Sequence, residues 1–180
     1  MVRMPGYGSR YWADRVSRRR TFPALKTSRT ADVVVIGGGL TGCTAAYVLA
    51  NAGMDVVLLE AERLASGSTA GSLGAIVPEP DALYRDVERA SGRRIARTAW
   101  KEASRSAREM AGALKKLAIA SELTPVEFIT NAAQPDIAGA LRREQAARQA
   151  AGIAAPWLTA ASVHQAIGTE SAVSGAVATA

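Results

Sequence analysis

The sequence predicts an α/β fold in which one βαβ unit is followed by a mostly helical segment, and three observations support this prediction. A β-branched run at 33–36 leads into a glycine-rich turn and a helix of small residues. A second apolar run at 56–59 ends in an acid, Glu60. From about residue 81, apolar residues recur at three- and four-residue steps, which is the spacing of one helix face.

The turn Gly37-Gly38-Gly39-Leu40-Thr41-Gly42 follows the first strand, which we expect to be buried on both faces of a parallel sheet. Gly37 permits a tight strand-to-helix turn, Gly39 lets the backbone approach a pyrophosphate, and Gly42 lets the helix pack against the strand. The backbone N–H groups and the positive dipole end of the helix would then face phosphates. The pattern therefore predicts a Rossmann-like, dinucleotide-binding βαβ unit.

The acid Glu60 stands where the second strand ends, and a carboxylate there accepts hydrogen bonds from ribose hydroxyls and repels a 2′-phosphate. This favours FAD or NAD over NADP. A tract of small and hydroxyl-bearing residues follows at 63–77, in which Ser68 and Thr69 can donate to phosphate oxygens. The tract favours FAD, and an NAD-linked dehydrogenase is kept as an alternative.

Residues 32–77, DVVVIGGGLTGCTAAYVLANAGMDVVLLEAERLASGSTAGSLGAIV, resemble the N-terminus of FAD-dependent oxidoreductases of the D-amino-acid oxidase superfamily, which includes glycine and sarcosine oxidases. A second run at 141–168, LRREQAARQAAGIAAPWLTAASVHQAIG, resembles the region between the flavin loops and the substrate sheet of that family. The resemblance implies FAD as cofactor. Covalent flavin attachment is not supported, because the 63–77 tract has no histidine and Cys43 stands on the glycine-turn helix.

The resemblance also implies a role for each segment of the cofactor site. The glycine turn would hold the diphosphate, and Glu60 and Ala61 would hold the ribose. Ser68 and Thr69 would contact the diphosphate or the ribityl chain. Leu73, Gly74 and Ala75 would pass near the flavin ring. The predicted cofactor-binding residues are Gly37, Gly38, Gly39, Leu40, Thr41, Gly42, Glu60, Ala61, Ser68, Thr69, Leu73, Gly74 and Ala75.

Beyond the βαβ unit we expect a helical region at 81–117 that is broken at Ser91-Gly92. Its apolar stripe would consist of Ile95, Ala99, Ala103, Ala107, Met110, Leu114 and Leu117, opposite a solvated basic face.

The remaining elements are predicted from their boundary residues. They are a strand at 126–130, a helix from Pro135 to Ala150 ended by Gly152, a helix from Ala160 to Ile167 with Thr159 as N-cap and Gly168 as its end, and a strand within 173–180 with no partner after it. The single histidine, His164, is expected to be a surface or structural group.

Charge is distributed unevenly along the 180 residues, whose formal net charge is +6. The first thirty residues contain eight arginines and lysines and one acid, Asp14. Such an arm can bind nucleic acid or a membrane surface, but we favour a solvated arm with one helical turn at 11–17, and expect no nucleic-acid partner. The single cysteine, Cys43, excludes an internal disulfide and a thiol-rich metal site. No export signal or membrane span is recognised, so we expect a cytoplasmic protein without a metal.

We therefore predict a basic arm at 1–30, an FAD-binding βαβ unit with its flavin loop at 31–80, and a helical segment leading into a substrate domain at 81–180. The function expected is oxidation of a small-molecule amine or amino acid by hydride transfer to flavin. The final strand predicts that the fold is incomplete at the C-terminus, so the chain would be an N-terminal portion without assignable catalytic residues. A non-catalytic nucleotide- or partner-binding remnant is the alternative, and the oligomeric state is not predicted.

Overall fold

The computed structural model describes residues 21–132, 135–168 and 176–179. The chain divides into two compact units, Met1–Ala75 and Ile76–Ala180. Residues 21–30 form neither helix nor strand, as predicted for this part of the basic arm. The helical turn predicted at 11–17 lies outside the described residues.

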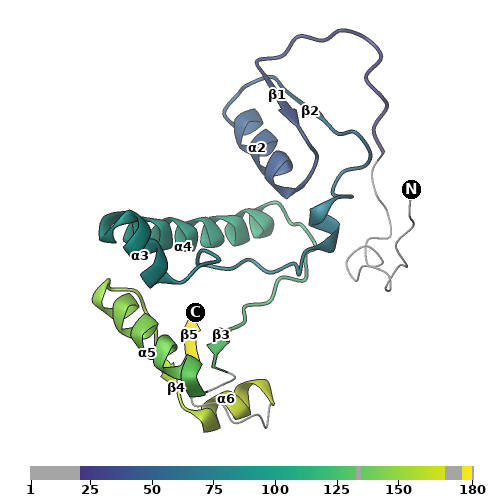
Figure 1. Cartoon of the computed structure of the whole chain (residues 1–180). Helices are drawn as coiled ribbons and strands as arrows, with labels where there is room; N and C mark the ends of the chain where they lie inside the picture. The colour runs from purple at the N-terminus through teal and green to yellow at the C-terminus, as the bar shows by residue number, and fades with distance from the viewer. Residues whose placement is uncertain (1–20, 133–134, 169–175, 180) are drawn as a thin grey trace, which may run out of the picture. The chain divides into compact units, whose positions relative to one another are not determined.

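The first unit is built on a parallel pair of strands joined by a helix (Figure 1). Strand β1 (Val33–Ile36) pairs in parallel with β2 (Val56–Leu59), and Val33 lies opposite Val56. Helix α2 (Leu40–Asn51) connects them and contacts both strands. The predicted βαβ unit is confirmed, and a short 3₁₀ helix, η1 (Ser68–Gly71), follows it.

The expectation that strand β1 is buried on both faces is wrong for the described structure. Val33 and Val35 are half-buried, whereas Val34 is 54% exposed and Ile36 is 85% exposed. The difference arises because α2 packs over the Val35 face of the two-stranded sheet, and alternate side chains of a strand point to opposite faces.

The second unit begins with helices α3 (Tyr84–Ser91) and α4 (Arg93–Lys116), separated at Gly92 as predicted. The apolar stripe predicted along α4 is correct only in part. Its middle members are half-buried, but Ile95 is 51% exposed, and the buried positions near the start of α4 are Ala96 and Trp100. The Trp100 side chain offers far more apolar area than Ile95, and its packing on Tyr84 therefore sets the rotation of the helix.

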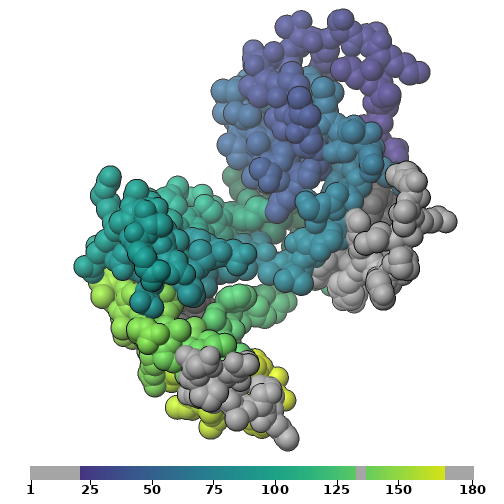
Figure 2. Space-filling view, viewed as in Figure 1, coloured from purple at the N-terminus to yellow at the C-terminus, as the bar shows by residue number. Residues whose placement is uncertain are grey.

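Helix α5 (Pro135–Ala150) completes the helical layer and ends before Gly152, which has a positive φ of 76°. The core beneath the helices consists of Tyr84, Ala96, Trp100 and Ala151. Helix α3 contacts both α4 and α5. Figure 2 shows this layer in space-filling form, where the teal atoms of α3 and α4 meet the light green atoms of α5.

A three-stranded antiparallel sheet in the order β3-β5-β4 forms the rest of the second unit. Its strands are β3 (Phe128–Asn131), β4 (Trp157–Leu158) and β5 (Ala176–Thr179). The final strand was predicted without a following partner, and the structure pairs it with two earlier strands.

Helix α6 (Ala160–Ile167) has the boundaries predicted for it. The Thr159 Oγ1 atom accepts a hydrogen bond from the Ser162 N–H at 3.2 Å, and Gly168 adopts the left-handed conformation that ends the helix. Val163 is fully buried against Ile129 and Leu158, while the neighbouring His164 is exposed.

Candidate cofactor site

The glycine turn owes its geometry to two positions that only glycine fits without strain. Gly37 has a φ of 104°, which L side chains rarely adopt, and its N–H donates to the Leu59 carbonyl at 2.8 Å. A Cβ added to Gly42 would overlap the Gly37 carbonyl oxygen and come within 3.4 Å of Val35 Cγ1. The absence of a side chain at Gly42 therefore lets helix α2 start close against strand β1.

Glu60 lies beside this turn and is held by backbone amides. Its Oε2 atom accepts from the Gly38 N–H at 2.6 Å, and its Oε1 atom accepts from the Glu62 N–H at 2.9 Å. The hydrogen bonds from Glu62 and then Gly38 lower the pKa of the Glu60 carboxyl. The structure therefore places a carboxylate, ionised at neutral pH, between the end of β2 and the glycine turn.

The tract after Glu60 returns to the turn and closes over it. The Ala65 N–H donates to the Gly38 carbonyl at 2.8 Å, and Thr69 Oγ1 accepts from the Leu40 N–H at 3.0 Å. Leu64 packs on the buried Gly38, where a Cβ would overlap its Cδ2 atom. The tract is thus an ordered part of the site, as the position of Thr69 at the start of α2 demonstrates.

Helix α2 begins with amides that remain available to a ligand. The first turn of a helix has N–H groups without intrahelical acceptors, and Thr69 satisfies that of Leu40. The amides of Thr41 and Gly42 have no acceptor among the residues that the structure describes. The N-cap is Gly39, which has no side chain, and no acidic residue occupies the first turn. This helix end therefore combines free donors with a positive dipole end, which suits an anion.

The structure brings together part of the predicted residue set. Contacts join Gly38 to Glu60 and Leu40 to Thr69. The other predicted residues that follow Glu60 are exposed and make no hydrogen bond to the turn within the described part of the chain: Ala61, Ser68, Leu73, Gly74 and Ala75. The Gly74 N–H instead donates locally to Ser72 Oγ at 3.2 Å.

Three contributors to the site were not predicted from the sequence: Glu62, Leu64 and Ala65. Glu62 and Ala65 contribute through their backbone N–H groups, which every residue except proline has, so the sequence does not mark these positions. Leu64 could have been noticed, because it is one of the few large apolar side chains among the small residues that follow Glu60. A side chain at Gly38, the second glycine of the turn, would require Leu64 to shift.

A parallel βαβ unit with a glycine turn, a helix N-terminus open to anions and a carboxylate after the second strand is the arrangement of a dinucleotide-binding unit. The chain belongs to the FAD dependent oxidoreductase family, whose model matches residues 32–180. The family resemblance seen in the sequence is thereby confirmed.

Individual relatives match shorter stretches. The chain is 39% identical over 85 residues to gamma-glutamylputrescine oxidoreductase of Escherichia coli, covering 47% of this chain and 19% of that protein. It is 51% identical over 55 residues to the mitochondrial sarcosine dehydrogenase of Homo sapiens, covering 30% of this chain and 6% of that protein. It is 55% identical over 42 residues to an L-amino-acid oxidase of Echis ocellatus, covering 23% of this chain and 8% of that protein.

The chain spans less than a third of the length of the curated relatives it matches. Within the described part of the chain, no helix is both long enough and apolar enough to cross a membrane.

Proposed function

We propose that the first unit binds the adenosine diphosphate half of FAD. The observation that carries this proposal is the meeting of Glu60, Thr69 and the glycine turn at the start of α2. The free amides of Thr41 and Gly42 would donate to the diphosphate, and Gly39 would let it approach the backbone.

The ribose contact is proposed for Glu60. Each of its carboxylate oxygens accepts one backbone N–H, and each oxygen has a second lone pair that can accept from a ribose hydroxyl. The lowered pKa keeps this carboxyl charged at neutral pH, so it would repel a 2′-phosphate. By family likeness, Ala61 would lie near the ribose, Ser68 near the diphosphate or ribityl chain, and Leu73, Gly74 and Ala75 near the flavin ring.

The reaction proposed for the protein is oxidation of a small-molecule amine or amino acid. The names of the relatives support this class, since two are an amino-acid oxidase and a sarcosine dehydrogenase. When bound, FAD supplies the hydride acceptor. The described residues of the first unit would bind and orient the cofactor. Backbone amides would donate hydrogen bonds to the diphosphate, and the Glu60 carboxylate would accept hydrogen bonds from the ribose.

Calorimetric titration of the 180-residue chain with ADP tests the proposed site. We expect binding, and we expect Gly42→Ala to weaken it by about tenfold or more, equivalent to ~1.4 kcal/mol, because the added Cβ displaces the start of α2 from the strand. Gly71→Ala is the matched control. No atom lies within 4 Å of a Cβ built there, so its affinity should equal that of the wild type.

Two comparisons separate FAD from the other dinucleotides. FAD should bind more tightly than NAD, and adenosine 2′,5′-bisphosphate should bind more weakly than ADP because of Glu60. Far-UV circular dichroism establishes that each variant is folded. The proposal would be refuted if the folded wild-type chain bound neither ADP nor FAD. If NAD bound more tightly than FAD, the site would be assigned to NAD.

A further inference from the structure

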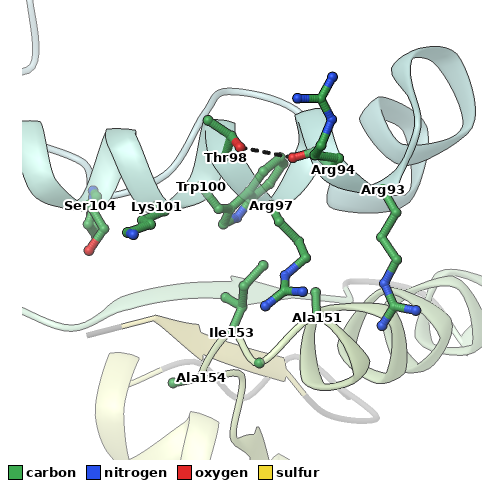
Figure 3. Close-up of a pocket in the computed structure, with 12 residues that line it drawn as sticks. Arg93, Arg94, Arg97, Thr98, Trp100, Lys101, Ser104, Ala151, Ile153 and Ala154 are labelled. Atoms are coloured by element: carbon green, nitrogen blue, oxygen red, sulfur yellow. Dashed lines mark hydrogen bonds between the residues drawn. The ribbon is translucent and has the colours of Figure 1, made fainter.

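A basic pocket in the second unit lies between the N-terminal half of α4 and the segment 151–154 that follows α5 (Figure 3). Its volume is about 780 Å³, which is within the usual range of about 300–1,000 Å³ for small-molecule sites. Within the part of the chain that the structure describes, four cationic residues and no acidic residue line it; the cations are Arg93, Arg94, Arg97 and Lys101.

The spacing of these cations places like charges next to one another. Arg93, Arg97 and Lys101 follow at steps of four residues, so they are neighbours on one helix face, where like charges destabilise a helix. Arg93 is the only one of the three whose side chain has a partner within the described part of the chain: it donates to the Ala150 carbonyl at 2.5 Å and lies 4.0 Å from Glu88. Among the described residues, no carboxylate forms an ion pair with Arg97 or Lys101.

The next turn of the same helix provides a contrast. There Arg105 is paired with Glu102 and with Glu109, the latter at 3.3 Å. Arg105 thus has carboxylate partners on its own helix, whereas Arg97 and Lys101 have none among the described residues. An anionic ligand would supply the missing countercharge.

An unpartnered donor inside the pocket wall is the second, independent observation. Trp100 is 3% exposed, and its indole Nε1 has no hydrogen-bond acceptor. In Figure 3, Trp100 and Arg97 both lie on the face of α4 that looks toward Ile153. A buried N–H without an acceptor costs free energy, so such groups normally have a partner, and a ligand oxygen that displaces the side chains covering this nitrogen would provide one.

The hydroxyl groups of the lining fit the same ligand chemistry. Ser104 Oγ accepts from Arg108 at 2.7 Å, which leaves its own proton to donate. The pocket thus presents donors from Arg97, Lys101 and Ser104, beside apolar surface from Ile153. We propose that it binds a small molecule that carries a phosphate or diphosphate group, because such a group offers several acceptor oxygens and more than one negative charge.

This proposal is independent of the glycine turn, and calorimetric titration of the 180-residue chain with inorganic pyrophosphate tests it. We expect binding that Arg97→Gln and Lys101→Gln each weaken by about tenfold. Arg105→Gln is the matched control: it removes one charge from the same helix, but Arg105 does not line the pocket and is paired with Glu102 and Glu109, so affinity should change less than about twofold. Gly42→Ala should leave pyrophosphate binding at this pocket unchanged.

Thermal unfolding provides a second readout that a structural role for Arg97 would not produce. Without ligand, Arg97→Gln should raise Tm, since it relieves the repulsion on α4, and the variant should gain less in Tm from pyrophosphate than the wild type. Absence of pyrophosphate binding, or loss of affinity that is equal for the Arg105 and Arg97 variants, would overturn the proposal. Tighter, Arg97-dependent binding of a duplex oligonucleotide would assign the pocket to nucleic acid and overturn it as well.

Discussion

Arg148 is the residue on which the buried charges of the second unit depend. It is 4% exposed, its Nε donates to Glu144 Oε1 at 2.7 Å, and its Nη1 donates to Glu79 Oε2 at 2.5 Å. Glu144 in turn accepts from the N–H groups of Tyr84 and Arg85 and thereby caps the start of α3. One guanidinium therefore bridges two buried carboxylates and joins α5 to the segment before α3, while Glu144 joins α5 to α3.

Replacing this arginine tests that role. We expect Arg148→Met to reduce the free energy of unfolding by about 3–5 kcal/mol, because methionine fills the volume but removes the cation that pairs with the buried carboxylates of Glu79 and Glu144. Urea unfolding monitored by circular dichroism measures the change. Arg105→Met, on exposed pairs of α4, should reduce it by less than about 1 kcal/mol. Equal effects of the two variants would contradict a special role for Arg148.

At the scale of elements, the break between α3 and α4 depends on the backbone of Gly92. Its φ of 83° and ψ of 157° lie in a region that is essentially restricted to glycine. Gly92→Ala should therefore lower the free energy of unfolding by about 1–3 kcal/mol. The same substitution at Gly112, inside α4 and without atoms near an added Cβ, should raise it by about 0.5–1 kcal/mol. Urea unfolding of both variants measures these two changes in the free energy of unfolding. If both changes had the same sign, the special role of Gly92 would be refuted.

Elements with local boundary signals were the ones that could be predicted from the sequence. Gly92, Thr159 and Gly168 act through their own backbone or side chain, so the helix ends they define agree with the structure. The same holds for Gly37 and Gly42, which explains why the turn of the candidate site was recognised.

Features that depend on distant partners could not be predicted in the same way. Glu144 and Arg148 have the spacing of an exposed helical ion pair, and only Glu79, 69 positions from Arg148, shows that the pair is buried. Likewise, the exposure of Ile36 depends on which layers cover the sheet, and the rotation of α4 depends on the contact between Trp100 and Tyr84. In the candidate site, the return of Thr69 to Leu40 spans 29 positions and leaves no periodic pattern.

At the scale of the whole molecule, the division after Ala75 predicts that the two proposed sites respond to ligands separately. All proposed ADP contacts belong to the first unit, and the pocket lined by Arg97 belongs to the second. A ligand that binds only the folded form of one unit stabilises that unit by mass action. Amide exchange in β1, β2 and α2 should therefore slow with ADP, while exchange in α4 should slow with pyrophosphate in the Gly42→Ala variant.

Hydrogen–deuterium exchange with mass spectrometry measures both effects in one chain. Slowing confined to peptides of 33–59 with ADP is the expected outcome, and it reports local opening rather than global unfolding. The Arg97→Gln variant should keep the ADP response in full and lose the pyrophosphate response in α4. If ADP instead slowed exchange equally in α2 and α5, the two units would unfold as one cooperative body, and the independence of the two sites would be refuted.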